Sequence, residues 1–330
     1  PPPFLLKDMP IIHKTTYKGP PRYMYSAHLQ TILPSLLRRV PGVVYERERL
    51  TLTDGDFVDL DWLDRGSKKL VIITHGLEGD SSRHYVKGTA RLFAQAGWDV
   101  LAWNCRSCSG EMNRAFRLYN HGEIGDIGEV IAHALTIRSY DKVTLIGYSM
   151  GGNITLKYLG VHGRQVPDVI RRAAAISAPT DLHASARMLD LPSNRFYRNR
   201  FMKKLVLKMR RKAELFPGRL DLSSLQQVRV WRDFDEAFSA PINGYRDAED
   251  FYTQASAVNF MPGITVPTLL LNAQNDPILS PECSPGWLAE THPHIYLETP
   301  STGGHVGFAA AGDLHTWAER RALAFMETGA

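Results

Sequence analysis

The chain has 330 residues, 44% of them apolar, which is enough for one large α/β domain or two small ones. Its formal net charge is +5, but no nucleic-acid reader motif accompanies this charge, so we expect no nucleic-acid partner. No apolar run has the length of a membrane span, no secretory signal pattern is recognisable, and three cysteines are too few for a disulfide framework. We therefore expect a cytoplasmic protein.

The spacing of apolar residues predicts an α/β protein with a mostly parallel sheet and helices on both faces. Short apolar runs alternate with amphipathic segments, as in strands joined by crossover helices. The predicted elements, in chain order, are an N-terminal arm at 1–42 with a helix near Ala27–Leu37 bounded by Pro34 and Pro41, a hairpin of 43–52 and 57–63, a strand at 70–74, a helix at 85–96, a strand at 99–103, a helix at 127–136, strands at 143–146, 173–177, 268–272 and 295–298, and a helix at 313–327.

Residues 183–250 interrupt this alternation, and we interpret them as a basic helical cap inserted into a core of 43–182 and 251–330. Between Arg187 and Arg219, eleven Lys or Arg are opposed by two acidic residues, so the local net charge is +9. This charge fits an ordinary solvated helix face, or a surface that contacts lipid head groups or acidic ligands. The sequence leaves both interpretations and the oligomeric state open.

The segment Gly147-Tyr148-Ser149-Met150-Gly151 has the pattern G-x-S-x-G between a predicted strand and a predicted helix. In that context the turn is so tight that glycines must flank the serine. The serine hydroxyl is then held at the end of the strand and at a helix N-terminus, where amides can meet negative charge. Ser149 is therefore the predicted nucleophile.

A serine needs a base to take its proton and an acid to orient that base. Asp276 and His305 each follow a late predicted strand, in the order Ser, Asp, His that this kind of sheet uses, so we predict the triad Ser149–Asp276–His305. The rivals are weaker. The alternative base is His121, and the nearest alternative acid, Asp313, has the pattern of a helix N-cap. His292 and His294 precede the last strand, at the wrong end of the sheet, and His315 is predicted to lie at the surface of the final helix.

Acyl transfer also needs donors for the oxyanion that develops on the substrate carbonyl. We assign this role to the amide of Met150, directly after the nucleophile, and to that of Leu77, in the loop His75-Gly76-Leu77 after an early strand. The residues predicted to contact substrate are His75, Gly76, Tyr148 and His121.

Other chemistries find little support in the sequence. Cys105-Arg106-Ser107-Cys108 is formally C-x-x-C, but a glycine-rich loop follows it where a redox motif would open a helix. The metal-binding patterns H-E-x-x-H and paired C-x-x-C are lacking, and so are the glycine-rich nucleotide-binding patterns. We predict no metal and no cofactor.

At this level of detail the chain resembles the YheT-like, embryogenesis-associated branch of the α/β-hydrolases, which includes the abhydrolase-domain proteins 1, 2 and 3 and the yeast medium-chain ethyl-ester synthases. The segments that carry the resemblance are Ala27-His28-Leu29-Gln30-Thr31, His75-Gly76-Leu77-Glu78-Gly79, Asn104 to Gly110, Gly147 to Asn153, Asp233-Phe234-Asp235, Asn275-Asp276-Pro277 and Gly303-Gly304-His305-Val306-Gly307-Phe308. The resemblance implies the α/β-hydrolase fold with a helical cap, and esterase, lipase or acyltransferase chemistry. Asn275 and Cys105 depart from the usual pattern of the branch.

The sequence thus favours a serine carboxylic-ester hydrolase that acts on short- to medium-chain acyl esters through an acyl-enzyme. An acyltransferase or ester synthase would use the same triad, a lipase or phospholipase is a further alternative, and a non-catalytic binding protein on a hydrolase scaffold is a weaker one. The apolar residues of the predicted cap either bind the acyl chain or form the buried stripe of a helix; they are Phe196, Phe201, Leu205, Val206, Leu207 and Met209.

Overall fold

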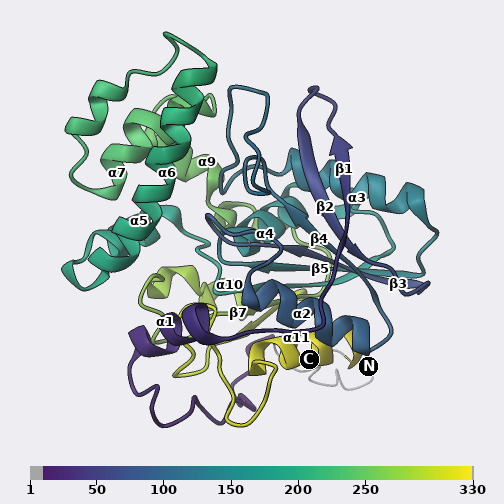
Figure 1. Cartoon of the computed structure of the whole chain (residues 1–330). Coiled ribbons are helices and arrows are strands. Elements are labelled where there is room, and N and C mark those ends of the chain that lie inside the picture. The colour runs from purple at the N-terminus through teal and green to yellow at the C-terminus, as the bar shows by residue number, and fades with distance from the viewer. Residues whose placement is uncertain (1–9, 329–330) are drawn as a thin grey trace.

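The computed structural model describes residues 10–328 and contains one eight-stranded sheet, with the strands in the order β1-β2-β4-β3-β5-β6-β7-β8 (Figure 1). The first nine residues of the predicted arm lie outside the described part. β2 is antiparallel to β1 and β4, and all other neighbours are parallel, so the predicted hairpin and sheet are confirmed. The strands are β1 Glu46–Thr51, β2 Phe57–Leu63, β3 Lys69–Thr74, β4 Asp99–Asn104, β5 Lys142–Tyr148, β6 Ile170–Ile176, β7 Thr268–Leu271 and β8 Ile295–Glu298.

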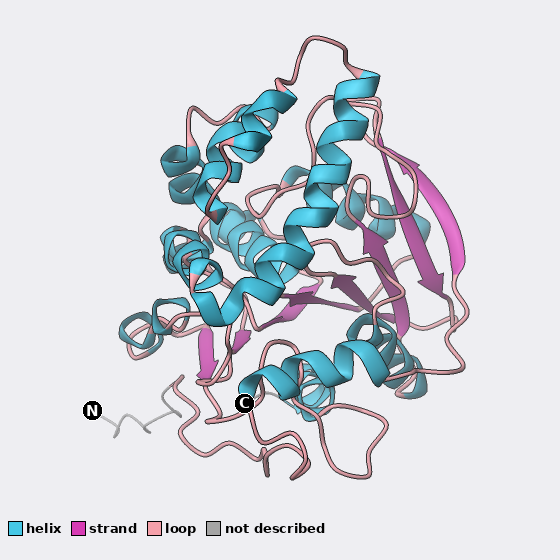
Figure 2. Cartoon of the chain, turned by 60° about the vertical axis from the view of Figure 1, so that its left-hand side comes forward, coloured by secondary structure: helices cyan, strands magenta, loops and turns pink. Residues whose placement is uncertain are grey.

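Helices lie on both sides of the sheet (Figure 2). The α-helices are α1 Ala27–Leu37, α2 His84–Gln95, α3 Gly125–Ile137, α4 Met150–His162, α5 Leu182–Asp190, α6 Arg195–Leu215, α7 Trp231–Phe234, α8 Ala240–Ile242, α9 Ala248–Ala255, α10 Gly286–Ala289 and α11 Trp317–Thr328. Short helical turns are η1 Gly163–Gln165, η2 Pro192–Asn194, η3 Leu222–Gln226, η4 Asp235–Ser239, η5 Ala257–Asn259, η6 Met261–Gly263 and η7 Pro281–Cys283.

Strand β3 shows why the central strands are apolar throughout. Leu70 and Ile72 pack into the core that α3 and α4 cover, whereas Val71 and Ile73 pack into the core beneath α2 and α11. Successive side chains of a strand point to opposite faces, and here both faces are dry. Burying each such side chain contributes about 1.5–3 kcal/mol, so this run holds the two helical layers against one sheet.

The arm helix α1 differs from its predicted form, because Pro34 lies inside it and does not bound it. Proline has no N–H to give to the carbonyl of Gln30, four residues earlier. That carbonyl faces Gly307, where a Cβ would lie only 2.2 Å from its oxygen. The released carbonyl thus marks the place where the arm docks against the loop after β8.

The C-terminal helix α11 begins four residues later than predicted. Thr316 caps it, since its hydroxyl accepts the amide of Glu319 and the Glu319 carboxylate accepts the amide of Thr316. Asp313 is not the N-cap; it accepts the amide of His315 and pairs with Arg320. His315 was predicted to lie on the surface of the helix, but it precedes α11 and is only 5% exposed.

Between β6 and β7 the chain forms a group of helices, α5 to α9, which stands apart from the sheet at the upper left of Figure 1. The predicted cap, 183–250, starts just inside α5 and ends inside α9. These helices share a separate apolar cluster; its members include Leu182, Leu205, Trp231, Phe234 and Phe251. Within residues 10–328, no helix combines the length and apolar character needed to cross a bilayer.

Candidate active site

The predicted nucleophile, Ser149, lies between β5 and α4 in a strained backbone conformation with φ 53° and ψ −120°. Two glycines make room for this turn. A Cβ at Gly147 would lie 2.1 Å from the Gly151 carbonyl oxygen, and one at Gly151 would lie 2.3 Å from the Thr74 carbonyl oxygen. Such strain costs on the order of 1–3 kcal/mol and persists where the surrounding packing enforces it. The fold thus fixes the serine hydroxyl at the carboxyl end of the central strand.

The structure brings the three residues of the predicted triad within hydrogen-bond distance. His305 Nε2 lies 2.9 Å from Ser149 Oγ, and His305 Nδ1 lies 2.8 Å from Asp276 Oδ2. A carboxylate only accepts, so Nδ1 carries the proton and Nε2 is left to accept from the serine hydroxyl. The second oxygen of Asp276 accepts the amides of Ile278 and Leu279, which fixes the plane of the carboxylate.

The arm holds the loop that carries His305. Thr31 Oγ1 accepts the His305 amide at 2.9 Å, and Gln30 Oε1 accepts the Gly303 amide at 2.9 Å. Asn275 links both sides, because its Nδ2 donates to Gln30 Oε1 and its Oδ1 accepts the Gly304 amide. Sequence reasoning gave Gln30 and Thr31 no role. Their place in a segment shared with related proteins was the signal available.

The loop after β3 lies directly beside the serine, since a Cβ at Gly76 would be 3.0 Å from Ser149 Cβ. Among residues 10–328, the amides of Leu77 and Met150 donate to no other group. The next residue, Glu78, is fixed by its amide, which donates to Tyr119 Oη, and by its carboxylate, which pairs with Lys208 at 2.8 Å. Both predicted oxyanion donors are thus free, Leu77 on this fixed loop and Met150 at the first residue of α4.

Two residues predicted to contact substrate are instead internal supports. His75 is fully buried; its Nδ1 donates to the Gly76 carbonyl and its Nε2 accepts the Cys105 amide. Burial lowers the pKa of His75 to about 4, so the ring is neutral at pH 7. The Tyr148 hydroxyl bonds Thr89 in the core between β5 and α2. Neither side chain lines a cavity at Ser149, so both assignments are corrected, whereas Gly76 and His121 do line one.

The cysteines form no cluster suited to redox exchange. Cys105, Cys108 and Cys283 are all free thiols, and burial raises the pKa of each. A thiol held neutral in this way is a weak nucleophile. The two thiols of the C-x-x-C pair are therefore weak nucleophiles, and Cys108 Sγ accepts a hydrogen bond from Lys208 Nζ at 3.4 Å.

Two cavities meet at Ser149, and both also include His305 and Leu77. The first lies beneath the cap helices. Of the six apolar cap residues singled out from the sequence, three line it: Phe201, Leu205 and Met209. Phe196 lines the other cavity, and Leu207 is exposed. Burial raises the pKa of Asp235, a carboxyl in this first cavity, to about 6.

The second cavity lies between the arm, the loop after β3, the start of α2 and one side of α6. Its lining differs sharply from that of the first, because several arginines and lysines reach it. Of the eleven Lys and Arg counted between Arg187 and Arg219, only Arg200 and Lys204 line this cavity.

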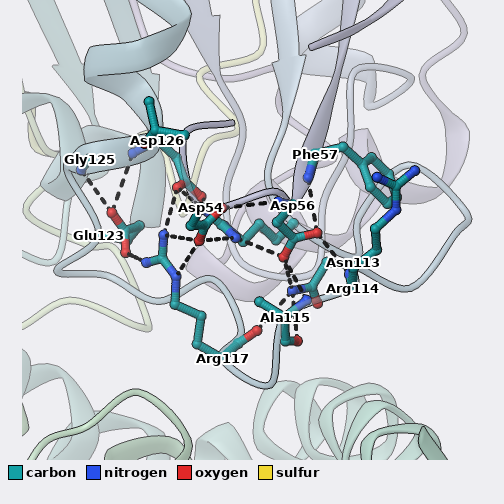
Figure 3. A network of polar contacts seen from close by, with 12 residues as sticks. Asp54, Asp56, Phe57, Asn113, Arg114, Ala115, Arg117, Glu123, Gly125 and Asp126 are labelled. Carbon is teal, nitrogen blue, oxygen red and sulfur yellow. Dashed lines mark hydrogen bonds and ion pairs between the residues drawn. The ribbon is translucent and has the colours of Figure 1, made fainter. Parts of the chain in front are cut away.

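A buried ionic network braces the wall of the first cavity at residues 118–121. The Asp56 carboxylate accepts Asn113 Nδ2 and the amides of Arg114 and Ala115, as Figure 3 shows. Burial alone would raise the pKa of Asp56, but these hydrogen bonds lower it to about 2. Arg106, which is fully buried, also pairs with Asp56 at 2.7 Å. The network ties the hairpin turn to the loop that leads into the cavity wall.

The chain was compared with known proteins. A family model described as the alpha/beta hydrolase fold matches residues 69–310. YheT of Escherichia coli (strain K12), a candidate esterase, is 34% identical over 310 residues, which cover 92% of this chain and 90% of YheT. Phospholipase ABHD3 of Mus musculus is 27% identical over 92% of this chain and 76% of its own. The Pyrococcus furiosus esterase PF2001 superposes with a TM-score of 0.54 at 19% identity, over 80% of this chain and 84% of that one, which bears on the fold alone.

Proposed function

The chain belongs to the α/β-hydrolase family, in its YheT-like branch, and from this membership and the geometry at Ser149 we propose that it is a serine carboxylic-ester hydrolase. The observation that carries the proposal is the continuous relay from Ser149 Oγ through His305 to Asp276, with separations of 2.9 and 2.8 Å, at the meeting point of two cavities. The esterase and phospholipase names of its relatives agree with this chemistry.

In the first half-reaction, Ser149 Oγ attacks the ester carbonyl while its proton moves to His305 Nε2. The negative charge that develops on the carbonyl oxygen is met by the amides of Leu77 and Met150. The carbon–oxygen bond to the alcohol then breaks, and His305 gives its proton to the departing alkoxide. The products are a free alcohol and an acyl-Ser149 ester.

In the second half-reaction, water attacks the acyl-enzyme and His305 takes one of its protons. The carboxylic acid leaves, and the serine hydroxyl is restored. Asp276 keeps the imidazole in one tautomer and stabilises its charged form throughout. The cavity beneath the cap takes the acyl chain, because aliphatic and aromatic side chains dominate its lining.

The test is turnover of 4-nitrophenyl butyrate and octanoate by Ser149→Ala. We expect kcat to fall about 10⁴-fold or more, because the variant has no nucleophile. A matched control, Ser193→Ala, changes an exposed serine and should keep native rates. Equal melting temperatures for all three proteins would show that folding is intact. Native turnover by Ser149→Ala, or failure of a fluorophosphonate to label the native serine, would reject the proposal.

A further inference from the structure

The second cavity at Ser149 carries an excess of positive charge. Six cationic side chains line it, from the arm, from α2 and its N-terminal flank, and from α6: Arg38, Arg39, Arg83, Lys87, Arg200 and Lys204. Arg38 is neutralised by Glu319, with which it forms a bidentate pair. Within residues 10–328, Arg39, Lys87, Arg200 and Lys204 lie within ion-pair distance of no carboxylate. Four of the six cations are therefore uncompensated.

The single carboxylate in the lining does not offset them. Glu78 pairs with Lys208 at 2.8 Å, so its charge is already balanced by a lysine outside the lining. Its backbone carbonyl accepts hydrogen bonds from Lys204 and Arg83, which draws both cations toward the loop beside the serine. Two of the six cations therefore lie against the loop beside the serine, and the others line the same cavity.

Helix α6 separates this charge from the apolar cavity. Phe196, Arg200 and Lys204 recur every four residues and face the second cavity. Leu205 and Met209 face the first cavity, beneath the cap. Ser149 belongs to both cavities, so an ester bound there would have one apolar side and one cationic side.

Holding like charges together without a counter-ion is unfavourable. Burial lowers the pKa of Lys204; the charges of Arg83, Lys208 and Arg200 lower it further, and the charge of Glu78 opposes them only in part. These cations therefore repel one another within the folded chain. A ligand that brings negative charge would relieve this repulsion and would gain several charge-assisted hydrogen bonds.

We infer that the second cavity binds a phosphate group on the alcohol side of the ester, while the acyl chain occupies the cavity beneath the cap. A phosphate fits better than a carboxylate, because a phosphate monoester carries more charge and offers three acceptor oxygens where a carboxylate offers two. The inference rests on the proposed hydrolase activity and names its substrate class. The bonds that form and break are those given above, and the departing alcohol carries the phosphate away.

The test compares two soluble esters that share one acyl chain, 1-octanoyl-glycerol and 1-octanoyl-glycerol 3-phosphate, below their aggregation concentrations. The quantity measured is the ratio of kcat/KM for the phosphate ester to that for the neutral ester. For the native enzyme we expect a ratio of about 10 or more, since hydrogen bonds to charged groups are worth on the order of a tenfold effect each. The ratio should fall as sodium chloride is raised to ~0.5 M.

The variant Arg200→Gln/Lys87→Gln removes two uncompensated cations, from α6 and α2, and should bring this ratio close to ~1. The matched control, Lys203→Gln/Arg210→Gln, removes two exposed charges of α6 that line neither cavity, and should keep the native ratio. An equal fall in both double variants would show a general surface effect and would overturn the inference. So would a native ratio near ~1 or a ratio unchanged in Arg200→Gln/Lys87→Gln.

A second arm identifies the source of the phosphate. 1-Oleoyl-glycerol 3-phosphate embedded in phosphatidylcholine vesicles replaces the soluble ester. If the preference for the phosphate ester depends on Arg200 and Lys87 when the ester is soluble, the natural substrate is a freely diffusing ester of a phosphorylated alcohol. If the preference shows this dependence only when the ester is embedded in vesicles, the phosphate belongs to a lipid head group. Hydrolysis of the neutral ester without phosphate preference would overturn this inference and leave the proposed function standing. Failure to hydrolyse any of the esters would instead count against the function.

Discussion

The position of the His305 ring depends on single polar side chains far away in the chain. Thr31 Oγ1 accepts the His305 amide, and Ser177 Oγ accepts the amide of Val306. These contacts act on the backbone of the loop, so they set where the imidazole stands between the serine and the aspartate. A ring displaced by about 1 Å can lower a rate about 100-fold, even when the reacting groups are all present.

Replacing Thr31 by valine keeps its shape but removes the acceptor for the His305 amide. We expect kcat for 4-nitrophenyl butyrate to fall about 10- to 100-fold with little change in KM, because Thr31 acts on the rate through the backbone of His305. Thr31→Ser keeps the hydroxyl and should restore most of the rate. The positioning role would be contradicted if KM fell as much as kcat. It would also be contradicted if Thr31→Ser were as slow as Thr31→Val.

A second effect at this scale concerns Asp235, the carboxyl in the cavity beneath the cap. Burial raises its pKa to about 6 in the folded protein, and the Tyr252 hydroxyl donates to its Oδ2 at 2.7 Å. An acid with a raised folded pKa binds its proton more tightly when folded. The folded state therefore loses stability as the pH rises from about 4 to about 6, and the loss is complete above that range.

Asp235→Asn removes this titration and keeps an acceptor for Tyr252. We expect the free energy of unfolding of the variant, relative to the native protein, to rise by on the order of 3 kcal/mol between pH 4 and pH 7.5. Urea unfolding at several pH values in that range measures the difference. A difference that does not change with pH would show that Asp235 has an ordinary pKa.

At the scale of elements, the loops at the carboxyl ends of the strands carry the chemistry, and buried polar groups fix them. The loop after β4 runs from Cys105 to the start of α3, and it includes the cavity wall at 118–121. Arg106 joins this loop to the hairpin turn and to α3, through Asp56 and Asp126. The carboxylates of Asp56 and Asp126 are both buried. The positive charge of the Arg106 guanidinium therefore compensates their negative charge inside the protein.

Arg106→Gln should lower the free energy of unfolding by about 3–5 kcal/mol, because it leaves the buried Asp56 without a cationic partner and leaves Asp126 with Arg117 alone. The comparison variant is Arg117→Gln, which removes a half-exposed arginine from the same network, for which we expect a loss of about 1 kcal/mol or less. Urea denaturation followed by circular dichroism gives both values. Losses of equal size would mean that burial of the guanidinium is not what matters.

At the scale of the whole molecule, the arm contacts the core at two places. Its polar residues hold the His305 loop, and Arg38 at its end forms a bidentate pair with Glu319 of α11, at 2.6 and 2.8 Å. Gly88 of α2 makes room for this pair, since a Cβ there would lie 2.1 Å from Glu319 Oε1. The arm, α2 and α11 thus meet at the buried ion pair of Arg38 and Glu319.

Arg38→Gln removes the bidentate guanidinium from the buried Glu319 carboxylate, which then keeps only the Thr316 amide and the His315 ring as partners. We expect the free energy of unfolding to fall by about 3 kcal/mol, together with faster cleavage of the arm by trypsin. Arg39→Gln, at the exposed neighbouring position, should change stability by about 0.5 kcal/mol or less. Indistinguishable urea midpoints for the two variants would show that the pair does not hold the arm.

Local patterns in the chain were enough to place most elements. The apolar run of β3, the hairpin around Gly55 and the turn at Ser149 all obey rules that act over a few residues. The same rules erred at Pro34 and at Asp313. In both cases a contact with a distant or later residue decides the outcome: the released Gln30 carbonyl packs against Gly307, and Thr316 and Glu319 cap α11.

By itself, then, the sequence determined the alternating sheet and the candidates Ser149, Asp276 and His305, because strand periodicity and tight turns are encoded by neighbouring residues. Only the tertiary structure decided that Gln30 and Thr31 hold the histidine loop and that His75 and Tyr148 are internal supports. It also decided which cations of α6 face the serine. Those outcomes depend on how distant segments pack, and packing between distant segments leaves no periodic trace along the chain.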